Sequence, residues 1–308
     1  MVFCRARSKG RAPLPDTDTA ENDDTALEIA LDPEPKAVDR PDPLLDGGYE
    51  VLRRSALVYS NFRSGTHMLR SSLIQLTDFQ TGGEVFARTN TASGSFSDYV
   101  AQPETNTTDL LLDPERHLPL FLAHHISTLD AANPVLFDVK YSQAARLGVD
   151  DMTLAPTVLK FFVALHVPIL HVIRRDVVAQ AISHLLAEQR GRFHAEADAS
   201  GGSETPTAPV WLNPSEVCDL AQTRREEQRR AQAHLTAISA DVCTIFYEDL
   251  SGTTLVPELR RISRFLGRYT RVDPGYKPPT RAQNSRLDVA NRVEIYDLAM
   301  ERMPGLVL

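Results

Sequence analysis

The stretch YSNFRSGTHML, residues 59–69, has the residue types of an anion-binding loop. It joins an apolar run at 55–60, typical of a buried strand, to a segment at 66–76 whose leucines recur at helical spacing. The first N–H groups of a helix have no partner within the helix, and they lie at the positive end of the helix dipole. A strand that enters a helix through this loop therefore predicts a site for an anion.

The side chains of the loop fit the same chemistry. Arg63 adds a permanent cation, and Gly65 lets the backbone approach a phosphate closely. Ser64 and Thr66 add hydroxyl groups, and His67 adds a ring donor. We predict that all five bind the anion.

Two other interpretations of the loop have to be weighed. Ser64 and Thr66 are also common helix caps, so SGT alone does not establish phosphate binding. A nucleoside-triphosphate loop requires GxxxxGK[ST], but here Ser60 replaces the first glycine and Thr66 stands where the lysine belongs. The pattern argues against a nucleoside triphosphatase.

A second candidate group follows another apolar strand, predicted at 168–173. This strand ends at Arg174 and Arg175. Ser183 lies eight positions after Arg175 on a helix predicted at 177–189, for which Asp176 is a suitable N-cap. Ligands of open α/β sheets bind at the carboxyl ends of the strands, and arginine gives bidentate recognition of phosphate. Taken alone, an arginine at a strand end and a serine on a helix are unremarkable.

The remaining elements must position these groups. Apolar strands alternate along the chain with helical segments, and this alternation predicts a parallel sheet flanked by helices, a P-loop-like α/β fold. The further strands are expected at 135–142 and 241–250, and the further helices at 155–165, 215–239 and 255–266. The helix at 215–239 carries TRREEQRR, whose mixed charges favour a solvated face over a nucleic-acid surface.

The net charge of -8 comes from the N-terminal part of the chain. Residues 16–50 hold twelve acidic residues against two basic ones, in a segment with few aromatic residues. We expect residues 1–48 to be a disordered, acidic, proline-rich tail and residues 49–308 to form one domain. Residues 191–214, rich in Gly, Ser, Pro and Thr, are predicted to be a flexible insertion.

The sequence also indicates what the protein lacks. No apolar run resembles a signal peptide or reaches the ~18 residues of a membrane span, so we expect a soluble, cytoplasmic protein without a transmembrane segment. The three cysteines form no CxxC pair and the nine histidines form no HExxH cluster, so neither a disulfide framework nor a metal site is predicted.

The two motifs together resemble those of the sulfotransferases that use 3′-phosphoadenosine 5′-phosphosulfate (PAPS). An Arg followed by SGT between a strand and a helix resembles their 5′-phosphosulfate loop, and Arg175 with Ser183 resembles their 3′-phosphate motif. The chain is most similar to bacterial Stf0-type carbohydrate sulfotransferases, through GGEVF, FDVK, EQRGRFH and IFYEDL with a following FLG. The resemblance covers roughly residues 55–270 and implies the sulfotransferase fold.

In that family a glutamate acts as general base, and Glu84 in GGEVF is its counterpart, although Val85 replaces the usual proline. Other sulfotransferases use a histidine, which makes His124 and His125 in FLAHHIST the rival candidates. Lys140, at the end of a predicted strand, would neutralise charge on the transferring sulfonyl group.

Arg63 would stabilise the charge that develops on the bridging oxygen. The late stretch KPPTRAQNSRLD resembles a loop that closes over the nucleotide, which makes Arg281 a further phosphate contact. The expected activity is transfer of the sulfonyl group of PAPS to a hydroxyl of a carbohydrate or glycolipid, with PAP as the product and no metal. A homodimer is expected by family analogy.

Two other functions remain open. A kinase-like phosphoryl transferase would use the same loop for ATP and would need magnesium. A non-catalytic nucleotide-binding relative would keep the loop without turnover. Both are distinguished from a sulfotransferase by which nucleotide binds.

Overall fold

The computed structural model describes residues 47–87, 96, 99, 113–147, 155–190, 209–268, 272–278 and 289–305, all within one compact unit. Three predictions therefore fall mostly or wholly outside the described residues. These are the acidic tail, except for its last two glycines, the segment 191–208 of the predicted insertion, and Arg281.

A parallel five-stranded sheet forms the centre of the described part, in the order β2-β3-β1-β4-β5. This confirms the predicted α/β fold with a parallel sheet flanked by helices. Its three central strands are buried except for Ile173, the last residue of β4, as expected for strands covered on both faces. The strands are β1 (Ala56–Ser60), β2 (Gln80–Glu84), β3 (Val135–Lys140), β4 (Ile169–Ile173) and β5 (Val242–Phe246).

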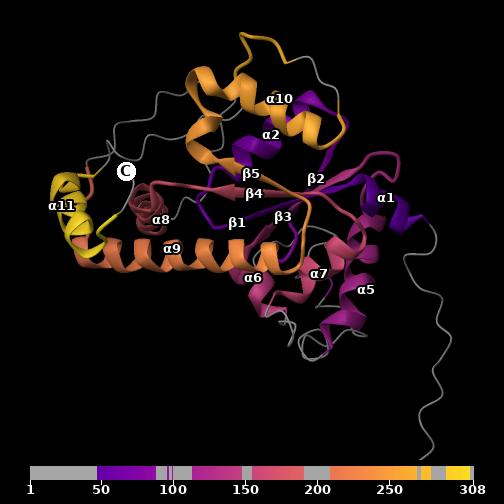
Figure 1. The fold of residues 1–308 in the computed structure, drawn as a ribbon, viewed down its shortest axis with the longest axis horizontal. Helices are drawn as coiled ribbons and strands as arrows, with labels where there is room; N and C mark the ends of the chain where they lie inside the picture. Colours follow the sequence, from indigo (N-terminus) through magenta and orange to yellow (C-terminus); the bar gives the residue numbers. More distant parts are fainter. Residues whose placement is uncertain are drawn as a thin grey trace, which may run out of the picture. The chain divides into compact units, whose positions relative to one another are not determined.

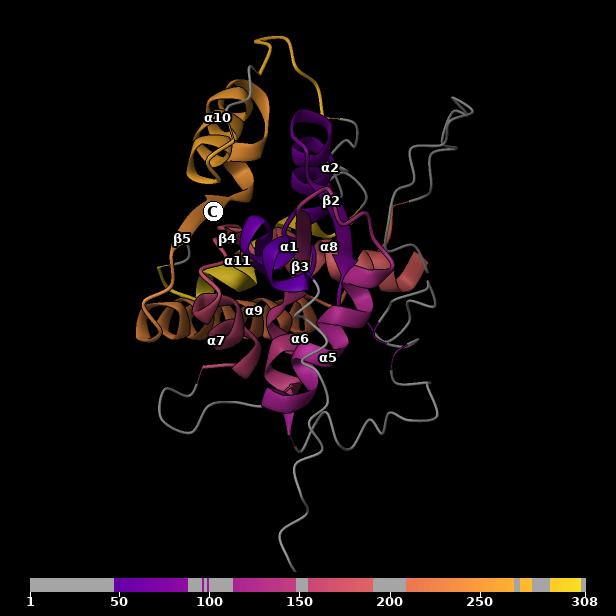
Figure 2. The same cartoon turned by 90° about the vertical axis from the view of Figure 1, so that its right-hand side faces the viewer.

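Helices cover both faces of the sheet (Figure 1). On one face lie α2 (Thr66–Leu76) and α10 (Leu255–Phe265), and on the other lie α5 (Pro114–Ser127), α6 (Tyr141–Arg146), α7 (Thr157–Ala164) and the long α9 (Pro214–Ala237). Figure 2 shows the same layers from the side. The helix α1 (Gly48–Arg54) precedes β1, while α8 (Val177–Arg190) and α11 (Arg292–Arg302) pack on α9.

Strand alternation decides which side chains meet each layer of helices. In β1, Leu57 and Tyr59 join the core under α9, whereas Val58 joins the core under α2 and α10. By the same alternation Ser60 at the end of β1 faces the α2 side, and so does Lys140, its neighbour in the register with β3. The two faces of the sheet therefore carry different parts of the site.

Most predicted elements have the predicted type, and Asp176 caps α8 through a 2.8 Å bond from the Ala179 amide to its carboxylate. Cys243 is a buried core residue, as expected. Five of the described α-helices and strands had not been predicted: α1, β2, α5, α6 and α11, of which α5 contains His124 and His125. Two predicted strands are also too long, because the chain turns into a helix after Lys140 and into a 3-10 helix after Phe246. Within the described part, no helix is long and apolar enough to cross a membrane.

Candidate functional site

The loop between β1 and α2 is built from two left-handed backbone positions. Arg63 has φ 60° and Gly65 has φ 77°. Gly65 is the N-cap of α2, and its carbonyl accepts the first helical bond from the Leu69 amide at 3.1 Å. The amides at the start of this 11-residue helix therefore follow the loop directly, as the sequence predicted.

Gly65 is required for a second reason that the sequence did not reveal. A β-carbon at this position would overlap the ring of Tyr247, which follows β5. The aromatic ring thus occupies the space that a side chain would take. Glycine serves here to let Tyr247 pack against the loop, and the backbone conformation excludes other residues independently.

Arg63 contacts two of the groups that surround the loop. Its Nε donates to Ser183 Oγ at 3.1 Å, and its carbonyl accepts a 3.1 Å bond from Arg174 Nη1. The Arg174 guanidinium lies 4.5 Å from the centroid of the Tyr247 ring. Burial, and then the positive charge of Arg174, lowers the pKa of Arg63. Two cations held this close together favour an anion between them.

The loop backbone is held in place from α8. Gln180 donates to the Phe62 carbonyl at 2.6 Å and to Ser64 Oγ at 3.0 Å. Gln228, on α9, donates to Gln180 Oε1 at 3.3 Å and to the Arg174 carbonyl at 3.1 Å. Ser64 is buried. A fixed loop of this kind presents its donors without reorganisation.

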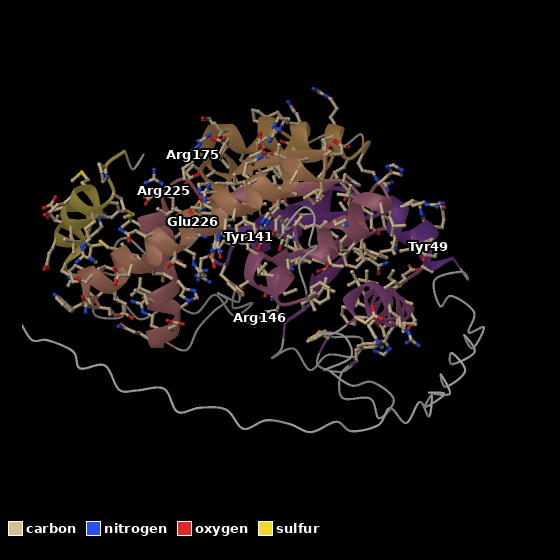
Figure 3. The ribbon with its side chains drawn as sticks, turned by 60° about the horizontal axis from the view of Figure 1, so that its bottom comes forward. Tyr49, Tyr141, Arg146, Arg175, Arg225 and Glu226 are labelled. Carbon is tan, nitrogen blue, oxygen red and sulfur yellow. The ribbon has the colours of Figure 1, made fainter. Side chains whose placement is uncertain are left out.

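Arg175 and Ser183, predicted to act together, have different partners in the structure. The Arg175 guanidinium lies 3.7 Å from the ring centroid of Phe246 and pairs with Asp249 at 3.4 Å (Figure 3 labels Arg175). Ser183 instead accepts from Arg63. Of the two adjacent arginines, Arg174 is the one whose side chain bonds to the loop. Sequence reasoning did not assign it a role, because adjacent residues at a strand end cannot be distinguished by type.

A buried group of charges lies on the α2 side of the sheet. Lys140 Nζ donates to both Asp138 oxygens at 2.7 and 2.9 Å and to Thr66 Oγ1 at 2.8 Å. Arg70 pairs with the same aspartate at 3.1 Å. The Glu84 carboxylate lies 4.0 Å from Lys140 Nζ and is about a quarter exposed. The structure thus brings Glu84, Lys140 and Thr66 together beside the start of α2.

The rival histidines lie in a different environment. The His125 ring packs 6.1 Å from both Phe121 and Phe137, in the core on the α5 side. Because Phe137 and Lys140 face opposite sides of β3, His125 is on the far face of the sheet from Lys140. His124 packs against Tyr99. His67 is exposed on the first turn of α2.

The interpretation of TRREEQRR as a solvated face is only partly right. Arg229 and Glu226 do form an exposed pair at 2.9 Å. Arg224, however, is buried, and it donates to Asn61 Oδ1 at 2.8 Å and to Glu227 Oε2 at 2.9 Å. Asn61 also donates to Glu227 Oε2 at 2.6 Å. The inner face of α9 therefore anchors the first residue of the loop.

Among the described residues, no group of three or more His, Cys, Asp or Glu side chains is placed to hold a metal ion. Cys218 and Cys243 are free thiols in the core.

Comparisons with known proteins give little further information. No family model matches the chain, and no curated protein matches it. A solved structure, the crystal structure of a sulfotransferase from Alicyclobacillus acidocaldarius, aligns over 81% of this chain and 95% of its own, with 13% identity and a TM-score of 0.39. At that level of similarity we draw no functional conclusion from it.

Proposed function

We propose that this protein is a sulfotransferase that moves the sulfonyl group of PAPS to a hydroxyl of a carbohydrate or glycolipid, releasing PAP. The observation that carries the proposal is the pair of guanidinium groups, Arg63 and Arg174, held with Ser183 at the start of α2. This arrangement suits an anionic group at the end of a nucleotide.

The residues present fit a nucleotide with phosphates at both ends. The loop Arg63–Gly65, with Thr66 and His67 on the first turn of α2, would hold the 5′ end. Arg175 and Ser183 would hold the 3′-phosphate. The Arg175–Asp249 pair is about 40% exposed, and such pairs are worth ~0–1 kcal/mol, so Arg175 can exchange Asp249 for a phosphate at little cost. Arg281 would add a further phosphate contact.

When bound, PAPS supplies an activated sulfonyl group. Glu84 is the group we assign as general base, because it combines partial exposure with proximity to Lys140. It takes the proton of the acceptor hydroxyl as that oxygen bonds to sulfur. Arg63 stabilises the charge left on the departing phosphate oxygen, and Lys140 stabilises the sulfonyl oxygens while it fixes Thr66.

Nucleotide titration tests the proposal. Isothermal titration with PAP should give saturable binding, and Arg175→Ala should weaken PAP binding by about tenfold or more while leaving AMP, which lacks the 3′-phosphate, unaffected. The control variant is Arg225→Ala, on the exposed face of α9. Absence of PAP binding contradicts the proposal, and preferential binding of ATP with magnesium supports a kinase-like enzyme instead.

The role of Glu84 is tested separately. With radiolabelled PAPS and a panel of sugars and glycolipids, Glu84→Gln should lower turnover by about 10²–10⁴-fold, the usual contribution of a general base. PAP affinity should stay at the wild-type value, because Glu84 is not assigned to the nucleotide. Loss of turnover in His125→Gln with an active Glu84→Gln protein would reverse the assignment. PAP binding without transfer to any acceptor would favour a non-catalytic relative.

A further inference from the structure

A cavity of about 100 Å³ lies on the α9 side of the sheet, away from the charges around Lys140. It is bounded by the end of β1, by α6 and by α9, and its lining includes Tyr59, Tyr141, Ala145, Glu227, Arg230 and His234. Figure 3 labels Tyr141 and Arg146, the first and last residues of α6, and Arg225 and Glu226 on α9. Because Tyr59 and Ser60 face opposite sides of the sheet, the cavity is separate from the proposed reaction site.

Three polar groups of the lining have unused hydrogen-bonding capacity, and one of them is His234, whose buried Nδ1 has no hydrogen-bond partner among the described residues. The Tyr59 hydroxyl makes no hydrogen bond to the described residues, and burial, followed by the charge of Glu227, raises its pKa so that it keeps its proton. Glu227 receives both of its bonds, from Asn61 and Arg224, at Oε2, which leaves Oε1 without a partner in the same part of the chain. A donor and an acceptor thus line one cavity.

Of the other lining residues, Tyr141 and Arg230 are already paired, while Ala145, Pro156 and Ala231 are apolar. The Tyr141 hydroxyl is paired with His171 Nε2 at 2.7 Å, and the Tyr141 ring meets the Tyr59 ring edge to face, with centroids 4.7 Å apart. At about 100 Å³ the cavity is smaller than an apolar cavity of ~150 Å³ that is known to hold benzene, but Ala145 at its mouth is exposed, so a single small ring that projects through this mouth is the largest group it takes.

The charged side chains around the cavity favour a neutral ligand. Arg224 and Arg230 lie beside the cavity or in its lining and disfavour a cation, while Glu227 disfavours an anion. Burial, and then the charge of Arg230, lowers the pKa of His234, so this ring is uncharged at neutral pH. Arg230 itself is held by Glu226 at 3.7 Å.

We propose that this cavity binds a neutral, single-ring compound that carries one hydroxyl group, a phenol or a ring alcohol. The ring packs on Tyr59 and Tyr141, its oxygen accepts from the Tyr59 hydroxyl, and its hydroxyl donates to Glu227 Oε1. Because Oε2 of the same carboxylate holds Asn61 at the start of the anion loop, occupation of the cavity is coupled to nucleotide binding.

The probe for the test is phenol, titrated into the full chain without nucleotide. Wild type and Arg225→Ala should bind it saturably with the same affinity. Tyr59→Phe should bind phenol at least about tenfold more weakly, because the hydrogen bond from the Tyr59 hydroxyl to the phenol oxygen is lost. The bond from phenol to the Glu227 carboxylate remains. Ala145→Trp fills the exposed mouth of the cavity from α6 and should abolish binding. Toluene, which has a similar ring without a hydroxyl, should bind more weakly than phenol.

Three results overturn the proposal: no saturable phenol binding by wild type, phenol affinity in Tyr59→Phe equal to that of wild type, or toluene binding as tightly as phenol. Thermal unfolding of each variant checks that it is folded, and Tyr59→Phe, which removes one oxygen, serves if Ala145→Trp does not fold. This test requires no nucleotide, so its failure is distinct from failure of the sulfotransferase proposal. Repeating the PAP titration with phenol present then measures the coupling, which is reciprocal.

Discussion

The anion loop depends on a few residues that could be recognised by type but not by partner. Arg63, Ser64 and Gly65 were predicted from their sequence, because a strand, a glycine and a helix define where free amides lie. The ring of Tyr247 against Gly65 was not predictable, since these residues are separated by most of the chain and only the folded sheet brings β5 beside the loop. The same limit applies to Arg174, which contacts Arg63 although the two residues are 111 positions apart in the sequence.

Substitution of Gly65 by alanine tests the two reasons for a glycine at this position, its left-handed backbone and the packing of the Tyr247 ring. The left-handed backbone costs an alanine of the order of 1 kcal/mol, and the overlap with Tyr247 displaces either the ring or the loop. We expect unfolding in urea to show a loss of about 2–3 kcal/mol, with a large loss of PAP affinity.

Gly267→Ala is the matched control for this substitution. Gly267 also has a left-handed backbone, at φ 65°, but a β-carbon there would meet nothing within 4 Å. It should therefore show only the backbone cost, with unchanged PAP affinity. Equal effects of the two substitutions on stability and affinity would contradict a role for Tyr247 in shaping the loop.

At the scale of elements, apolar runs and helical spacing were sufficient to predict the strands β1, β3, β4 and β5 and the helices α2, α7, α8, α9 and α10. β2 is the sequence QTGGE, which has no apolar run, and its strand conformation comes from pairing with β3. The helix α9 was predicted as a helix, but its function in the site was not. Its charged residues look alike in sequence, and only packing turns Arg224 inward toward Asn61.

The inward face of α9 gives a testable consequence. Arg224→Met removes the donor that Asn61 and Glu227 share, and leaves the partly buried carboxylate of Glu227 with only the Asn61 bond. We expect a loss of roughly 3 kcal/mol in the free energy of unfolding, with weaker PAP binding because Asn61 begins the loop. Arg225→Ala, one residue along and exposed, should change neither quantity by more than about 0.5 kcal/mol.

At the scale of the whole molecule, the sheet buries a titratable ring at its centre. His171 in β4 has no exposed surface, and its Nε2 is paired with the hydroxyl of Tyr141 across the α9 side of the sheet. Burial lowers the pKa of this histidine to about 4. The sequence predicts that His171 lies on a buried strand, but it does not reveal that the Tyr141 hydroxyl is its hydrogen-bond partner, which offsets the cost of burying the neutral ring.

This burial predicts how stability depends on pH. In the unfolded chain the ring takes up a proton near pH 6.5, whereas in the folded protein it does so only near pH 4. The unfolded state therefore binds more protons between these values, so stability falls as pH decreases from 6.5 towards 4, by up to about 3 kcal/mol from this group. Urea unfolding of wild type and His171→Gln from pH 7.5 to 4.5 measures the effect, and the slope should be much smaller in the variant. His166→Asn, at an exposed left-handed position that asparagine tolerates, is the control and should keep the wild-type slope. A wild-type slope in His171→Gln would show that other groups cause the loss of stability in acid.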